Sequence, residues 1–186
     1  TDATLGSDTA VNTALDAIDK IRDTATSMER IFVVEVMGRD CGFIALQVAV
    51  SGGAEEVLIP EREFDLDTIC EEIIEGNLKG KLSWIIIVAE GAGRADDITR
   101  RIHKQTDLEA REVVLGHIQR GGVPTARDRI LGTRLGNAAV DLILKGESDK
   151  AVGVLADEIS VSDLDFAVTR KDMKVDHLYG LLKILI

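Results

Sequence analysis

The sequence predicts an α/β domain built on a mostly parallel sheet with helices on both faces. Two apolar runs, 31–36 (IFVVEV) and 84–89 (WIIIVA), are rich in β-branched residues and are expected to be buried strands. The segments between such runs carry apolar residues at helical spacing, and the connections are only a few residues long. Strands that alternate with helices in this way are typical of a parallel sheet covered by helices.

The first half of the chain is expected to alternate from helix to strand three times. A helix should run from Ser7, a suitable N-cap, to about Thr24, because apolar residues recur there every three or four positions. Strand 31–36 is followed by a helix over 43–50, which the glycines at 52 and 53 end. A short strand over 57–59 ends at Pro60, and a helix with an apolar face closes at Gly80, ahead of strand 84–89.

The second half continues the alternation. A helix with a polar face is expected over 94–106, and a short strand over 113–115. A long helix over about 126–145 carries Leu131, Leu135 and Leu142, and Gly146 closes it. A strand over 151–156 follows, and the final LLKILI fits either a helix or a strand.

Charge and composition exclude several classes of protein. The net charge of −11 argues against nucleic acid or a membrane surface as a partner, because proteins that bind either usually carry an excess of Lys and Arg. Cys41 and Cys70 form no C-x-x-C pair, so neither a zinc site nor a disulfide framework is supported. With no signal peptide and no long apolar run, the protein is expected to be cytoplasmic. Because it begins at Thr1 inside a polar loop, we expect an incomplete chain, cut from a longer protein.

The stretch LGHIQRGG, from Leu115 to Gly122, is the clearest candidate for a binding site. Its three glycines let the backbone approach a ligand closely, and Arg120 can hold a phosphate through two parallel hydrogen bonds. On its own the stretch equally fits a tight turn with a core histidine and a solvated arginine, because single glycine-rich motifs are weak signals.

Position strengthens the binding interpretation. Met37-Gly38-Arg39, Glu90 and the segment 117–120 each follow directly on an expected buried strand. Ligands of open parallel sheets bind outside the carboxyl ends of the strands. We therefore expect these three groups of polar residues to meet at one edge of the sheet.

The spacing of these motifs resembles the 6-phosphofructokinase family, bacterial-type and most similar to the ATP-dependent members. Arg111 is followed after four residues by GHIQRGG and, five residues later, by Asp128-Arg129, which matches the family signature. MGR at 37–39 after the IFVVEV strand matches a second signature, and the first 24 residues are similar to the helix that follows the family's catalytic loop. The resemblance covers positions 1 to about 145. It implies a Rossmann-like lobe of the phosphofructokinase fold.

The resemblance also implies roles for individual residues. Fructose 6-phosphate would be bound within one subunit by Met37, Gly38, Arg39, Glu90, His117 and Arg120. Arg30 and Arg111 match arginines that reach the sugar phosphate in a neighbouring subunit, which implies a homo-oligomer, a dimer or a tetramer. A nucleotide effector would be bound by Arg22, Glu55, Lys79 and Lys81, although Lys79 and Lys81 also fit a solvated helix C-terminus.

The resemblance further indicates what this chain lacks. The family's catalytic aspartate lies in a T-I-D-N-D loop, and its ATP and Mg²⁺ are held by a G-G-D-G-S segment; neither motif occurs here. The expected catalytic base therefore lies upstream of Thr1, and we expect this chain alone to bind sugar phosphate without turnover, metal or ATP. Residues 1–120 would form the sugar-binding lobe, 121–156 would pack on the absent donor-binding lobe, and 157–186 would return to the sugar-binding lobe.

Three alternatives to an ATP-dependent, allosteric glycolytic kinase stay open. The pyrophosphate-dependent enzymes share MGR and the sugar loop, although His117 favours ATP. A non-catalytic regulatory domain could bind sugar phosphate through the same residues. A purely structural α/β module would leave the three converging groups without a role.

Overall fold

The structure is a computed structural model that describes residues 1–169 and 175–185. It divides the chain into two compact units, which are described separately. The sheet unit contains residues 11–120 and 175–185, and the hairpin unit contains residues 1–10 and 121–169. Helix α1 (Ser7–Met28) begins in the hairpin unit and continues in the sheet unit.

A fully parallel sheet forms the centre of the sheet unit. Within the described residues it has four strands: β1 (Ile31–Val36), β2 (Glu56–Leu58), β3 (Trp84–Ala89) and β4 (Ala110–Val114). Their order is β2-β3-β1-β4, and every neighbouring pair is parallel. The prediction of a parallel sheet is confirmed, and β3, β1 and β4 end side by side.

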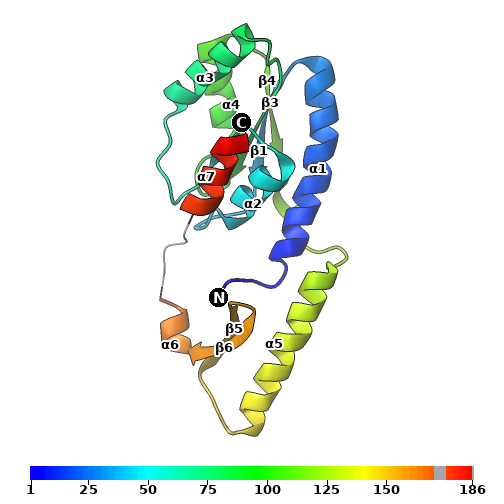
Figure 1. Ribbon diagram of the computed structural model, residues 1–186, viewed down its shortest axis with the longest axis vertical. Coiled ribbons are helices and arrows are strands. Elements are labelled where there is room, and N and C mark those ends of the chain that lie inside the picture. The colour runs from blue at the N-terminus through cyan, green and yellow to red at the C-terminus, as the bar shows by residue number, and fades with distance from the viewer. Residues whose placement is uncertain (170–174, 186) are drawn as a thin grey trace. The chain divides into compact units, whose positions relative to one another are not determined.

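Helices cover both faces of this sheet, as the sequence predicts (Figure 1). On one face, α1, α2 (Phe43–Gly52) and α7 (Asp176–Leu185) bury side chains such as Ile18, Leu46 and Leu182. On the other face, α3 (Leu66–Leu78) and α4 (Ala95–Thr106) bury Ile73 and Ile102. Successive β3 residues from Trp84 to Ala89 contribute alternately to the two cores, so the whole strand is apolar.

The hairpin unit has a different architecture. It contains α5 (Ala126–Leu144), β5 (Lys150–Leu155), β6 (Glu158–Asp163) and the short α6 (Leu164–Ala167). Strands β5 and β6 pair antiparallel, with Leu155 opposite Glu158. Strand β6 was not predicted, although EISVSD alternates polar and apolar residues as a half-exposed strand does. Ala156 and Asp157 both have positive φ and form the tight turn between the strands.

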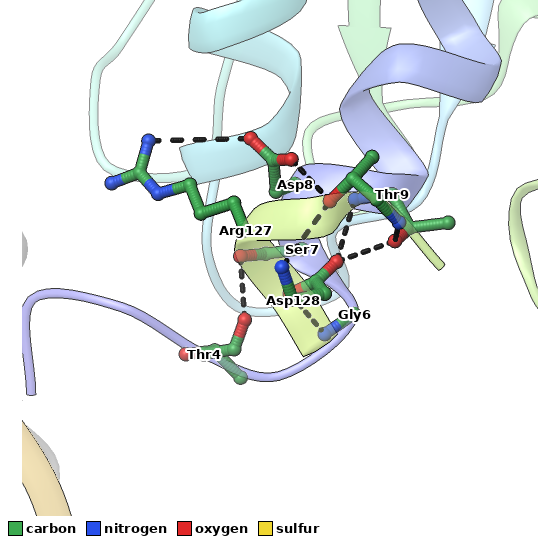
Figure 2. A network of polar contacts seen from close by, with 8 residues as sticks. Thr4, Gly6, Ser7, Asp8, Thr9, Arg127 and Asp128 are labelled. Carbon is green, nitrogen blue, oxygen red and sulfur yellow. Dashed lines mark hydrogen bonds and ion pairs between the residues drawn. The ribbon is translucent and has the colours of Figure 1, made fainter. Parts of the chain in front are cut away.

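Side-chain hydrogen bonds join the first turns of α1 and α5 (Figure 2). The Asp128 carboxylate accepts hydrogen bonds from the backbone N–H groups of Gly6 (2.9 Å) and Thr9 (2.8 Å). In return, the Thr125 hydroxyl donates to Asp8. The expectation that Ser7 is an N-cap is wrong: Ser7 is the first residue of α1, and its hydroxyl donates to the Thr4 carbonyl. A carboxylate distant in sequence takes the capping role instead.

Other element boundaries differ modestly from those predicted. Helix α1 extends to Met28 rather than Thr24, and β4 begins at Ala110 rather than Val113. The end of α1 and the start of β4 contain polar residues, which interrupt the apolar pattern used to predict each element. The final LLKILI contributes to helix α7. No helix in residues 1–169 or 175–185 has both the length and the apolar character needed to cross a membrane.

Candidate functional site

The segments that follow β1 and β3 are joined by backbone hydrogen bonds at the carboxyl edge of the sheet. Glu90 N–H donates to the Val36 carbonyl and Gly91 N–H donates to the Gly38 carbonyl, both at 3.0 Å. The Glu90 carboxylate in turn accepts from Gly38 N–H at 3.3 Å. The structure therefore brings the MGR segment and Glu90 together, as their positions after neighbouring strands predicted.

Close backbone contact at this edge requires glycine at two positions. A Cβ added to Gly91 would lie 1.7 Å from the carbonyl oxygen of Arg39, and one added to Gly38 would lie 2.6 Å from that of Cys41. Gly38 also has a φ of 151°, which side-chain-bearing residues rarely adopt. The backbone thus turns sharply after β1 and leaves Arg39 at the surface.

The GHIQ segment forms a short 3₁₀ helix, η1 (Gly116–Gln119), directly after β4. His117 and Arg120 are exposed at its two ends, whereas Gln119 is buried. The Gln119 side-chain oxygen accepts a hydrogen bond from Met37 N–H at 2.8 Å, which attaches η1 to the MGR segment. The third predicted group therefore joins the same edge.

Two further carboxylates hold the segments around this edge. Glu61 accepts from Gly42 N–H with both oxygens, at 2.8 and 2.9 Å, and fixes the end of the turn after MGR. Glu35, a strand residue, accepts from Ala95 N–H at 2.9 Å and caps α4, whose own N-cap residue makes no such bond. Chemically, the edge offers guanidinium and imidazole donors for an anion and the Glu90 carboxylate as an acceptor for hydroxyl groups.

Arg30 and Arg111 lie at the opposite, amino end of the sheet. Arg30 precedes β1, and the next residue, Ile31, is opposite Ala110 at the start of β4. Both guanidinium groups bind one carboxylate, Glu109: Arg30 Nε at 2.8 Å and Arg111 Nη2 at 2.6 Å. Hydrogen bonds from Arg30 and then from Arg111 lower the pKa of the Glu109 carboxyl below its usual value. The structure does not bring these two arginines to the carboxyl edge.

The four residues assigned to an effector are brought together in part. Glu55 accepts from Ile85 N–H at 2.7 Å, and Lys81 Nζ lies 3.5 Å from its other oxygen. Arg22 donates to the carbonyls of Gly52 and Gly53, close in sequence to Glu55. Lys79 instead pairs with Glu75 on its own helix, as expected of a solvated helix end. Of the described residues, no group of three or more His, Cys, Asp or Glu side chains could hold a metal ion.

Sequence reasoning missed the residues that hold the candidate site together. Gln119 was identified only as part of a motif, and Gly91 only as the residue after Glu90. Their roles depend on contacts between segments far apart in the sequence. In the sequence, Gln119 appears only as one polar residue in a polar loop. Nothing in that pattern indicates that its side chain is buried.

Comparison with known proteins identifies the family. The phosphofructokinase family model matches residues 1–143. The chain is 52% identical to an ATP-dependent 6-phosphofructokinase of Clostridium tetani and 49% identical to that of Clostridium novyi, each over 185 residues. Each match covers the whole of this chain but only 58% of the length of the relative.

Solved structures agree with this match. The structure of phosphofructokinase from Saccharomyces cerevisiae is 36% identical in sequence and aligns with a TM-score of 0.81, over 89% of this chain and 24% of that one. A phosphofructokinase from Pichia pastoris, crystallised in the T-state, aligns with a TM-score of 0.80 at 32% identity, over 100% of this chain and 22% of that one. The sequence and the fold lead to the same result: the chain belongs to the phosphofructokinase family.

Proposed function

We propose that the full-length protein containing this chain is an ATP-dependent 6-phosphofructokinase. It would transfer a phosphoryl group from ATP to the 1-hydroxyl of fructose 6-phosphate, as a glycolytic enzyme of the cytoplasm. The observation that carries this proposal is the meeting of MGR, Glu90 and the GHIQR segment at one sheet edge. The names of the curated relatives support ATP as the donor.

The carboxyl edge of the sheet supplies the sugar-phosphate contacts in this proposal. Arg39, His117 and Arg120 bind the phosphate group, and Met37 and Gly38 form the wall behind the sugar. Glu90 accepts hydrogen bonds from sugar hydroxyls, a role that arginines cannot take because they have no acceptor. Each charged hydrogen bond contributes about 1.5–3 kcal/mol, so losing one arginine should weaken binding by one to two orders of magnitude.

Arg30 and Arg111 serve a neighbouring subunit rather than this one. Strand β1 has six residues, and a strand rises about 3.3 Å per residue, so roughly 20 Å separate the amino end from the carboxyl edge. No arginine side chain spans that length. A shared site of this kind requires a homo-oligomer, a dimer or a tetramer, in which one subunit's amino end faces another's carboxyl edge.

The donor site lies in the remainder of the full-length protein. We propose that the catalytic base and the groups that hold ATP and Mg²⁺ precede Thr1, and that residues 121–156 pack against that donor-binding lobe. Helix α5 supports this, because Ile143 is 71% and Leu144 80% exposed in the described structure. The boundary between the two units at Gly121 supports the same division. Of the expected tail 157–186, residues 157–169 belong to the hairpin unit, and only α7 supports a return to the sugar-binding lobe.

A nucleotide effector would bind at the amino end of the sheet through Arg22, Glu55, Lys79 and Lys81. The contact between Glu55 and Lys81 supports this assignment for two of the four residues. Lys81 also lies 4.5 Å from the centroid of the Trp84 ring, so its position is fixed from two sides. Tightening or weakening of fructose 6-phosphate binding by a nucleoside diphosphate, lost in Lys81→Met, is the expected sign of this site.

A coupled assay on the full-length protein separates this proposal from its alternatives. Formation of ADP from ATP that depends on fructose 6-phosphate supports the ATP-dependent kinase. Consumption of pyrophosphate in place of ATP identifies the pyrophosphate-dependent enzyme. Binding of fructose 6-phosphate without either reaction identifies a non-catalytic sugar-phosphate-binding domain.

A further inference from the structure

Two neighbouring residues of η1 show the opposite of the burial expected from their polarity. Ile118, which is apolar, is 63% exposed, whereas Gln119, which is polar, is only 3% exposed. Burying a carboxamide is unfavourable unless it is hydrogen-bonded, and exposing an isoleucine gains nothing in stability. The inward position of Gln119 therefore needs a specific contact to explain it.

The hydrogen-bond ladder between β1 and β4 provides that contact. In this parallel pair Glu35 lies opposite Val114, and Leu115 N–H donates to the Glu35 carbonyl at 3.0 Å. The next step of an evenly spaced parallel ladder would join Met37 N–H to the Leu115 carbonyl. That carbonyl instead accepts from Ile118 N–H at 3.2 Å, because the chain turns into the 3₁₀ helix.

Gln119 replaces the missing acceptor. Its side-chain oxygen lies 2.8 Å from Met37 N and takes the hydrogen bond that the Leu115 carbonyl would have taken. The side chain thus continues the ladder by one step beyond the end of β4. This lets the backbone turn away and expose His117 and Arg120 while the MGR segment stays attached to β4.

We infer that Gln119 is a positioning residue that fixes the distance between the two halves of the candidate sugar-phosphate site, an inference that rests on the proposed function. One half begins at Met37, the donor of this hydrogen bond, and the other consists of His117 and Arg120 on either side of Gln119. Gln119 itself would not contact the ligand. Its loss should therefore weaken the binding of fructose 6-phosphate and leave the chemical step unchanged.

The test replaces Gln119 with methionine, which keeps the length of the side chain and removes the acceptor. Gln119→Met in the full-length protein should raise the KM for fructose 6-phosphate about threefold to tenfold, the range expected for one net hydrogen bond. The kcat and the KM for ATP should stay within about twofold of the original values. Gln105→Met is the matched control, because Gln105 is an exposed residue of α4 that binds Asp67 far from this edge.

Hydrogen exchange provides a readout that does not depend on activity. Mass spectrometry of overlapping peptides that begin before and after Met37 should show faster exchange of the Met37 amide in Gln119→Met and no change in Gln105→Met. If Gln119→Met does not fold, Gln119→Asn, which keeps the amide group but is one methylene shorter and does not reach Met37 N–H, should show the same shifts.

The outcomes separate the inference from the function on which it rests. An increased KM together with faster Met37 exchange supports the positioning role. Faster exchange with an unchanged KM overturns it, provided that Arg120→Ala raises the KM in the same assay. If Arg120→Ala also leaves the KM unchanged, the proposed sugar-phosphate site is wrong, and the positioning role of Gln119 at that site is wrong as well.

Discussion

Gly91 lies against the backbone of Arg39 so closely that no side chain fits between them. A Cβ on Gly91 would be 1.7 Å from the Arg39 carbonyl oxygen and 2.9 Å from that of Gly38. Gly91 N–H also donates to the Gly38 carbonyl at 3.0 Å. This contact holds the turn after β3 against the turn after β1, and so fixes Glu90 relative to Arg39.

Gly91→Ala should therefore displace the MGR segment, because both clashing atoms belong to the backbone and cannot rotate away. We expect a loss of about 1–3 kcal/mol in the free energy of unfolding, as for other overpacked sites. In the full-length protein the KM for fructose 6-phosphate should rise by tenfold or more. Gly180→Ala is the matched control: a Cβ there meets no atom within 4 Å, so this substitution in helix α7 should be neutral or stabilising.

Asp128→Asn should destabilise the hairpin unit. An asparagine cannot accept from Gly6 and Thr9 with both ends of its side chain, so one N–H of the first turn of α1 loses its partner. The expected cost is about 1–2 kcal/mol, measured by thermal unfolding followed by circular dichroism. Asp157→Asn should cost less than about 0.5 kcal/mol, because its pairing with Arg134 is exposed to solvent. Equal losses in the two variants would contradict the capping role.

The same carboxylate predicts a dependence of stability on pH. Burial raises the pKa of the Asp128 carboxyl, but hydrogen bonds from Thr9 and Gly6 outweigh burial and hold the pKa below its usual 3.8. The unfolded chain therefore binds a proton at a higher pH than the folded chain does. The contribution of Asp128 is complete above about pH 4 and is lost as the pH falls further, so Asp128→Asn should flatten the acid limb of a stability-versus-pH curve.

Lys183→Met should loosen helix α7. Lys183 Nζ lies 2.5 Å from Glu56, whose side chain is only 6% exposed, and the Tyr179 hydroxyl lies 3.4 Å from the same carboxylate. Without the Lys183 ammonium group, the buried Glu56 carboxylate keeps only the hydrogen bond from the Tyr179 hydroxyl among these two contacts. Because Lys183 is itself partly exposed, we expect a loss of about 2 kcal/mol, below the range for fully buried pairs. Lys79→Met, which removes an exposed pair with Glu75, should change stability by less than about 0.5 kcal/mol.

Much of the sheet unit was predictable because β1, β2 and β3 are buried on both faces. A run such as WIIIVA has no polar residue and is therefore expected to be a buried strand. The alternation of such runs with helices predicts a parallel sheet, whose binding residues lie at one edge. The failures occur where a contact distant in sequence decides the structure. Asp128 replaces Ser7 as a cap, although the two residues are about 120 positions apart. The sequence also could not indicate that Gln119 turns inward while Ile118 turns out.

The residues of the candidate site divide in the same way. The types of residue needed to bind a sugar phosphate were visible in MGR, Glu90 and GHIQR, and the strand ends that carry them are adjacent. Arg30 and Arg111 lie at the opposite end of the sheet because each stands at the start of its strand, and the register between β1 and β4 shows that these strand starts are side by side. Their shared partner Glu109 has no motif of its own.

The carboxyl edge of β1, β3 and β4 is the proposed binding site for the phosphate of fructose 6-phosphate. The most direct measurement is the KM for fructose 6-phosphate of Arg120→Ala in the full-length protein, compared with Arg100→Ala, which removes an exposed α4 arginine paired with Asp96 and Asp97. We predict a rise of tenfold to a hundredfold for Arg120→Ala and less than twofold for Arg100→Ala. An unchanged KM in Arg120→Ala, in a protein that folds and turns over, would contradict the account.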